Sequence, residues 1–133
     1  MLSKLRAAGA WRIGKFYLSE FPSLRIHGIE NAPEKPGIYA FVRNRRVVYL
    51  GSTGRTIRQR LTEYCRGQQK KNRAVHNALW NAITEDAASF SIWVLPMPDR
   101  RYHGLPVCVA KGVEWRLLNS DGYARPEFNW GSR

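Results

Sequence analysis

Two tyrosines lie ten residues apart, in neighbouring segments that the sequence predicts to be strands. Tyr39 belongs to residues 37–43 and Tyr49 to residues 47–51, and both segments are rich in β-branched and aromatic side chains. A phenol ordinarily titrates near about pH 10, so it acts as a base near neutrality only where a nearby cation lowers its pKa. Shared chemistry therefore requires the two phenols to lie on one face of the sheet, near a positive charge.

The pairing register decides which faces the phenols occupy, because successive strand residues point to opposite faces. A two-residue loop at 44–45 places the two phenols on opposite faces. A three-residue loop at 44–46 pairs Phe41 with Tyr49 and places both phenols on one face. We expect the three-residue loop.

A carboxylate falls on the apolar side of the last helix that the sequence predicts. Glu114 shares one face of residues 105–119 with Val107, Ala110 and Leu118. Burial of a lone carboxylate is costly, so Glu114 needs a cationic partner. That partner is either a divalent metal ion or an arginine in a structural ion pair.

Two arginines follow the second predicted strand on a helix of their own. Thr56 and Gln59 have the spacing of a capping box, which predicts a helix beginning near Ile57. Arg58 and Arg60 lie on either side of its apolar face. Helical phase therefore does not decide which arginine faces the tyrosines.

The remaining elements complete an α+β fold, with a small three-stranded antiparallel sheet flanked by helices. The third strand covers residues 90–95, and another helix covers residues 74–86. Residues 2–20 carry a broad apolar stripe and are predicted to form a helix, followed by a proline-rich linker. We therefore expect a helical extension over residues 1–35 and one domain over residues 36–133.

The charge balance indicates a polyanionic partner. The 133 residues include 22 Lys and Arg against 10 Asp and Glu, for a net charge of +12, which favours nucleic acid. No apolar run approaches the roughly 18 residues of a membrane span, and we expect no membrane partner. Cys65 and Cys108 have no metal-binding spacing and are expected to be buried thiols in a reducing, cytoplasmic environment.

Five features, in order, resemble the GIY-YIG nuclease family over roughly residues 36 to 130. The two signature elements carry the tyrosines, and the second has Leu50 in place of the usual isoleucine. An arginine helix, a glutamate helix and a proline-containing segment with an asparagine follow. The matching residues are Gly37-Ile38-Tyr39, Tyr49-Leu50-Gly51, Arg58 to Leu61, Glu114 and Pro126 to Asn129.

The resemblance implies a metal-dependent endonuclease that hydrolyses phosphodiester bonds in DNA. Glu114 would hold one Mg²⁺ or Mn²⁺ ion, and Arg60, with Arg58 as the alternative, would hold the scissile phosphate. One tyrosine would act as base or proton relay, for which we favour Tyr39, and the other would orient water. The implied catalytic residues are Tyr39, Tyr49, Arg60, Glu114 and Asn129, the last bracing the site by hydrogen bonds.

The expected partner is double-stranded DNA, and a homodimer or a partner protein would supply cleavage specificity. Two alternatives remain open: a non-catalytic nucleic-acid-binding module on the same fold, and a nuclease that acts on RNA. Basic side chains in several loops and helix ends are predicted to contact phosphates. These are Arg55, Arg58, Lys70, Lys71, Arg73, His76, Arg100 and Arg101.

Overall fold

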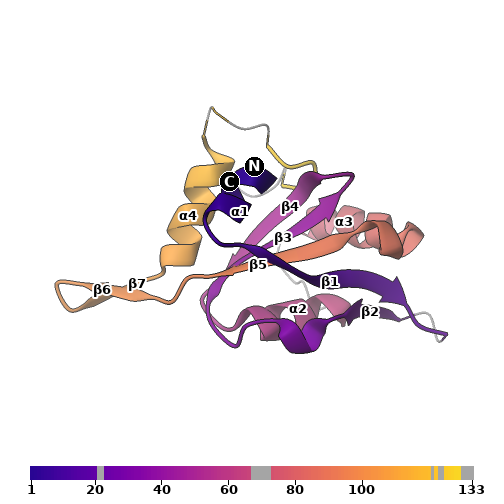
Figure 1. Cartoon of the computed structure of the whole chain (residues 1–133), viewed down its shortest axis with the longest axis horizontal. Coiled ribbons are helices and arrows are strands. Elements are labelled where there is room, and N and C mark those ends of the chain that lie inside the picture. Colours follow the sequence, from indigo (N-terminus) through magenta and orange to yellow (C-terminus); the bar gives the residue numbers. More distant parts are fainter. Residues whose placement is uncertain (21–22, 67–72, 121, 123–124, 130–133) are drawn as a thin grey trace.

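A five-stranded antiparallel sheet in the order β2-β1-β5-β3-β4 forms the centre of the computed structural model (Figure 1). The structure describes residues 1–20, 23–66, 73–120, 122 and 125–129, with only the backbone for 73–77. The helices are α1 (Leu2–Ala7), α2 (Ile57–Cys65), α3 (Arg73–Glu85) and α4 (Val109–Leu118), with 3-10 turns η1 (Ile29–Asn31) and η2 (Ala87–Ser89). The strands are β1 (Trp11–Leu18), β2 (Leu24–His27), β3 (Gly37–Arg43), β4 (Arg46–Thr53), β5 (Ser91–Pro96), β6 (Arg100–Tyr102) and β7 (Leu105–Val107).

The predicted α+β class, an antiparallel sheet flanked by helices, is confirmed, but the main sheet has five strands and not three. Each of the three predicted strands is present, as β3, β4 and β5. No helix in the described part of the chain is long and apolar enough to cross a membrane.

The prediction of one helix over residues 2–20, followed by a linker, is wrong. Only Leu2–Ala7 is helical, and β1 pairs with β5 on one side and with β2 on the other. A bulge between Arg12 and Gly14 shifts the register of β1, so its buried residues Ile13 and Phe16 lie three apart. That spacing is typical of a helix, and the expected helical extension is in fact two strands of the main sheet.

The β3–β4 hairpin reaches the predicted pairing by an unexpected route. Its loop has two residues, Asn44 and Arg45, both in the left-handed region with φ of 51° and 63°, as a tight hairpin turn requires. A bulge beside Phe41 then restores the register, so that Phe41 pairs with Tyr49. The expected three-residue loop is wrong, whereas the expected pairing and the shared face of the two phenols are confirmed.

Each face of the sheet packs against its own helices. Side chains of α2 and α3 cover the face that carries Tyr39, Phe41 and Tyr49. Side chains of α1 and α4 cover the opposite face, which carries Ala40 and Leu50. The capping box predicted for α2 is present, with Thr56 accepting from the Gln59 amide.

The edge strand β4 is covered by the end of the chain. Phe128 donates its backbone N–H to the Val48 carbonyl at 2.8 Å. The side chain of Asn129 bonds to the backbone of Leu50, accepting from its N–H at 2.9 Å and donating to its carbonyl at 2.8 Å. An otherwise open sheet edge is thereby closed beside Tyr49.

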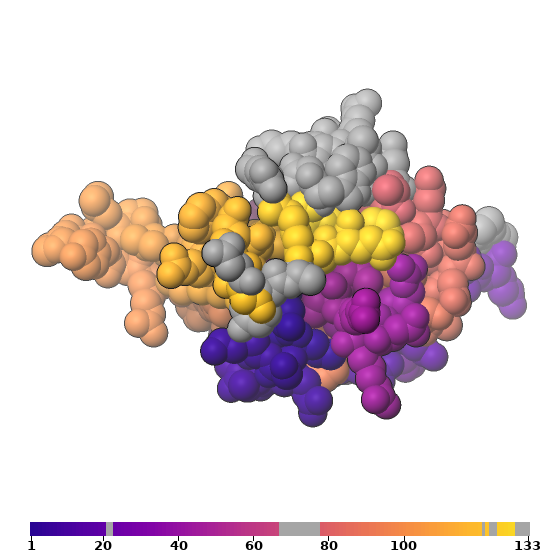
Figure 2. Space-filling model, turned by 90° about the horizontal axis from the view of Figure 1, so that it is seen from above, coloured from indigo at the N-terminus to yellow at the C-terminus, as the bar shows by residue number. Residues whose placement is uncertain are grey.

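The prediction of one helix over residues 105–119 is wrong in its first part. Pro106 pairs with Arg101 in a β6–β7 hairpin, and α4 begins only at Val109. The hairpin projects from the body in two perpendicular views (Figures 1 and 2). Its side chains are mostly in solvent, with Tyr102 70% and Leu105 67% exposed.

Candidate active site

Three tyrosine rings meet on one face of the sheet. The ring centroids of Tyr39 and Tyr49 lie 6.3 Å apart, and each lies 6.1 Å from the ring of Tyr64 on α2. Exposed fractions are only 1% for Tyr39, 6% for Tyr49 and 1% for Tyr64. The phenols therefore form a single, nearly dry cluster between β3, β4 and α2.

Two glycines are required where the strands carrying the tyrosines approach their neighbours. A Cβ on Gly51 would lie 2.3 Å from the Tyr39 ring and 2.5 Å from its hydroxyl oxygen. A Cβ on Gly37 would lie 2.4 Å from the carbonyl oxygen of Leu95. Glycine at position 51 thus lets the Tyr39 phenol lie across β4, and glycine at position 37 lets β3 pair closely with β5.

Arg60 is the arginine that joins the tyrosine cluster. Its Nε donates to the Tyr39 hydroxyl at 3.2 Å, and its guanidinium lies 5.0 Å from the centre of the Tyr64 ring. Because Arg60 donates, the Tyr39 hydroxyl accepts this bond and directs its own proton elsewhere.

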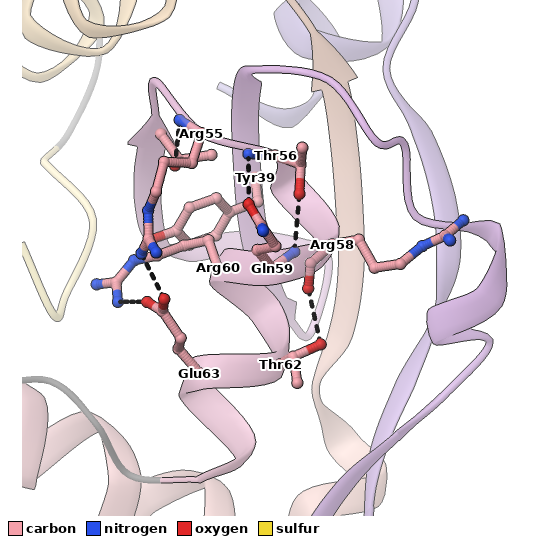
Figure 3. A network of polar contacts seen from close by, with 9 residues as sticks. Tyr39, Arg55, Thr56, Arg58, Gln59, Arg60, Thr62 and Glu63 are labelled. Atoms are coloured by element: carbon pink, nitrogen blue, oxygen red, sulfur yellow. Dashed lines mark hydrogen bonds and ion pairs between the residues drawn. The ribbon is translucent and has the colours of Figure 1, made fainter.

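Arg58 points to the other side of α2 (Figure 3). It donates to the backbone carbonyls of Ala32 at 3.1 Å and Glu30 at 2.9 Å, and forms an ion pair with Glu34. These bonds tie α2 to the segment before β3. The geometry thus resolves the choice between the two arginines in favour of Arg60 as the one beside the phenols.

A second carboxylate, which the sequence did not single out, links two arginines at the site. Glu63 lies 2.5 Å from Arg55 and 3.5 Å from Arg60, and Figure 3 shows all three side chains on the Tyr39 side of α2. The sequence could have indicated this ion pair, because Glu63 follows Arg60 by three residues and therefore lies on the same face of the helix.

Glu114 approaches the site from the opposite face of β4. The Ser52 hydroxyl donates to the Glu114 carboxylate, and Ser52 directly follows the glycine under Tyr39. Adjacent strand residues point to opposite faces, so the site extends around the edge strand. Sequence reasoning missed Ser52, although its place directly after the signature glycine was visible.

The carboxylate of Glu114 is half-buried, and no Lys or Arg among the described residues lies within the 4.0 Å ion-pair distance. Burial raises its pKa, while the Ser52 hydrogen bond and the charges of Lys111 and Arg60 partly offset the rise. The structural ion pair that we considered is therefore not formed within the described part of the chain.

The phenols are held neutral. Burial raises the pKa of Tyr39 well above its ordinary value and also raises that of Tyr49, while Arg60 acts in the lowering direction on both. Glu114 raises both values further, which places it within electrostatic reach of the cluster. The expectation that a nearby cation lowers the pKa of the base is thus only partly met, because burial outweighs the arginine.

The donors near Glu114 fit a hard divalent cation. No group of three or more His, Cys, Asp and Glu side chains gathers within the described ranges. Mg²⁺ does not require such a group, since it keeps several waters and is often bound by one or two carboxylates together with substrate phosphates. The Glu114 carboxylate, with the Ser52 hydroxyl beside it, matches that pattern.

Asn129 lies behind the site and not in it. It is 0% exposed, and both ends of its amide are bonded to Leu50. Its geometry is that of a brace for β4, and its part in catalysis stays a prediction.

The predicted phosphate-binding residues fall in several places. Arg55 is exposed beside Glu63, whereas Arg58 is engaged with the segment before β3. Arg100 and Arg101 are exposed on the projecting hairpin (Figure 1). Lys70 and Lys71 lie outside the described residues, as do the side chains of Arg73 and His76.

The fold is similar to those of two solved structures. A mutant of bacteriophage T4 EndoII has a TM-score of 0.63 and 16% identity, covering 95% of this chain and 96% of that chain. The restriction endonuclease HPY188I in complex with product DNA has a TM-score of 0.56 and 13% identity, covering 87% of this chain and 75% of that chain. No family model matches the sequence, and no curated protein is significantly similar to it. At sequence identities this low, the structural likeness shows a shared fold alone.

Proposed function

We propose that this chain is a GIY-YIG-type endonuclease that hydrolyses phosphodiester bonds in DNA with the help of one divalent cation. The observation that carries the proposal is the convergence of Tyr39, Tyr49, Arg60 and Glu114 around the edge strand β4. The likeness in fold to EndoII, and to a restriction endonuclease bound to product DNA, supports it.

Arg60 has the position needed to neutralise a phosphate at this site. Its side chain is largely buried and oriented by Tyr39 and Glu63, so little conformational freedom is lost when it binds an anion. A fixed cation in a water-poor site stabilises the negative charge that develops on phosphorus during hydrolysis. In the absence of substrate, the carboxylate of Glu63 neutralises part of the positive charge of Arg60.

The tyrosines supply hydroxyl groups for proton transfer and for orienting water. Tyr39 accepts from Arg60, so its proton can be donated or relayed, and Tyr49 lies next in the cluster. Both phenols are neutral near pH 7, since a phenol ordinarily titrates near about pH 10 and burial raises their pKa values further. Either can act as base only when it passes on its own proton as it accepts another.

Glu114 and Ser52 would hold the divalent cation, which would supply a Lewis acid at the phosphate and lower the pKa of a bound water. A cation there would also compensate the buried charge of Glu114. The cation is Mg²⁺ or Mn²⁺ in this proposal, since both suit oxygen donors.

A plasmid-nicking assay with purified protein tests the proposal, run with Mg²⁺ and with a chelator. Wild type is expected to nick the plasmid only with Mg²⁺, and Glu114→Gln is expected to bind DNA but nick it at least 100-fold more slowly, since one charged ligand is lost (about 3 kcal/mol in the barrier). Glu127→Gln is the matched control, because Glu127 pairs with Arg43 at 2.8 Å and is exposed. Its nicking rate should equal that of wild type.

The same assay separates the alternatives. Salt-sensitive DNA binding without any nicking would favour a non-catalytic module on this fold. Cleavage of an RNA duplex in preference to DNA would indicate an RNA-directed nuclease. Normal nicking by Glu114→Gln would exclude its assignment as metal ligand.

A further inference from the structure

Two adjoining hollows in the surface lie along α2, and together they are called the groove. The first has a volume of about 420 Å³ and contains Tyr17 and Arg25 from the β1–β2 side. The second has a volume of about 380 Å³ and contains Arg55. Thr62 and Arg66 line both hollows, so the two adjoin at these side chains between the β1–β2 side and Arg55.

The groove begins at the proposed active site. Arg55 and Arg60 share the carboxylate of Glu63, at 2.5 Å and 3.5 Å, and Glu63 itself lines the groove. Figure 3 shows Arg55 and Glu63 beside the Tyr39 phenol, at the first turns of α2. A strand bound at Arg60 can therefore continue into the groove without leaving the protein surface.

The far half of the groove carries positive charge without compensation. Arg25 and Arg66 are both exposed, and neither forms an ion pair with an acidic side chain in the described part of the chain. The charge of Arg25 also reaches α2, since it partly offsets the effect of burial, which raises the pKa of the Cys65 thiol to about 11. Two arginines thus line the same hollow.

The dimensions suit a nucleic-acid backbone. From Ile57 to Arg66 the chain rises roughly 14 Å along the helix axis, at about 1.5 Å per residue. A duplex whose axis runs parallel to α2 presents about four phosphates of one strand over that length, at about 3.4 Å of axis each. At the distal end Tyr17 is 40% exposed, and an exposed aromatic face is what a base stacks upon.

We propose that this groove binds the DNA strand that continues from the cleaved phosphate. Arg55, Arg66 and Arg25 contact its phosphates, and the Tyr17 ring stacks against an unpaired base. The inference rests on the proposed function, in that DNA is taken as the substrate, and it adds the path of the strand beyond the site.

The test measures DNA binding in a chelator, apart from cleavage, on a labelled duplex with single-stranded tails at its 5′ and 3′ ends. The double variant Arg25→Ser/Arg66→Ser should reduce the slope of log affinity against log salt by about 1.4 to 1.8, the value for two lost phosphate contacts. Lys4→Ser/Arg12→Ser removes the same charge from exposed residues outside the groove, and its slope should change by less than half as much. Both variants should melt like wild type, because all four side chains are exposed.

Tyr17 provides an independent test of the base contact. Tyr17→Ser should weaken binding about five-fold or more without changing the salt slope, because stacking neutralises no phosphate. Tyr17→Phe keeps the ring and should bind like wild type. An equal loss of affinity in both variants would exclude stacking.

The outcomes for the groove and for the nuclease are distinguishable. An unchanged slope in Arg25→Ser/Arg66→Ser, or an equal fall in the Lys4→Ser/Arg12→Ser control, overturns the groove whether or not wild type nicks DNA. A groove-dependent slope without any nicking supports the groove and overturns the nuclease. Failure of wild type to bind DNA overturns both.

Discussion

Gly51 lies directly under the ring of Tyr39, and this contact can be tested by adding one methyl group. Gly51→Ala puts a Cβ 2.3 Å from that ring, so the phenol must move or β4 must shift. We expect a loss of about 1–3 kcal/mol in unfolding free energy, measured by urea titration, because overpacking a well-packed site has that effect. Cleavage should fall as well, because the Tyr39–Arg60 hydrogen bond is displaced.

The control is Gly112→Ala in the middle of α4, where a Cβ would meet nothing within 4 Å. It should raise stability by roughly 1 kcal/mol, because alanine has the higher helix propensity. Equal effects at the two positions would contradict the packing argument at Gly51.

The carboxylate of Glu114 should make stability depend on pH. Its folded pKa is raised above the ordinary 4.5, chiefly by burial, so the folded protein holds this proton more tightly than the unfolded chain does. Stability from this group is therefore present at low pH and falls as pH rises from the ordinary pKa through the raised one. Glu114→Gln lacks this loss, so its unfolding free energy relative to wild type should increase across that window.

Urea titrations at several pH values, without divalent cations, measure this difference. A constant difference between the two proteins over the whole series would mean that the Glu114 pKa is not raised.

At the residue scale, the sequence predicts which residues share a site better than it predicts which side chains each of them contacts. The order of tyrosines, arginine and glutamate points to a common site, and Tyr39 and Arg60 are indeed hydrogen-bonded. Helical phase alone did not choose between Arg58 and Arg60, because both flank the apolar face of α2, and the family resemblance favoured Arg60. Only tertiary structure provides Glu34 as a partner for Arg58. Ser52 was missed for a similar reason, since its role depends on where α4 packs.

At the element scale, local irregularities decided which predictions failed. The bulge in β1 gives Ile13 and Phe16 a helix-like spacing, so periodicity alone favoured a helix over residues 2–20. Proline is common in the first turn of a helix, which favoured a helix beginning near Pro106. Here Pro106 lies in the two-stranded β6–β7 hairpin, an edge position at which a residue without a backbone N–H is tolerated. The bulge beside Phe41 had the opposite effect, because it preserved a predicted register that the loop length alone would have broken.

Asn129 joins the chain end to the edge strand, and its removal should affect stability. Asn129→Ala leaves the Leu50 N–H and carbonyl without their present partner in a buried position. We expect a loss of about 2–4 kcal/mol in unfolding free energy, because each buried unsatisfied group costs about 1–3 kcal/mol. Urea unfolding followed by tryptophan fluorescence measures the change.

Asn119→Ala is the matched control for that substitution. Asn119 is exposed, and its side chain donates to the Trp115 carbonyl at 2.8 Å, its one hydrogen bond to a described residue, so its loss should change stability by about 0.5 kcal/mol or less. A variant at Asn129 with unchanged stability and reduced cleavage would instead assign this residue to the substrate.

At the scale of the whole molecule, charge and exposed shape point to one kind of partner. The chain carries a net charge of +12, and exposed arginines occur at both ends of α2 and on the projecting hairpin. The hairpin pairs Tyr102 with Leu105 and leaves both in solvent. Contacts distributed in this way bind a long polyanion through its backbone, and backbone contacts carry no sequence information by themselves.

Duplex binding should therefore be steeply salt-dependent and nearly the same for unrelated sequences. If six to ten phosphates are contacted, affinity should fall about 10³- to 10⁵-fold between roughly 50 and 200 mM salt, because each contact releases condensed counterions. Fluorescence anisotropy on two duplexes of equal length and unrelated sequence measures both properties. Arg100→Ser/Arg101→Ser should lower the slope by up to about 1.8 without lowering the melting temperature, since both side chains are exposed on the hairpin. A flat salt titration would exclude backbone binding, and a large preference for one duplex would show that base contacts determine the affinity.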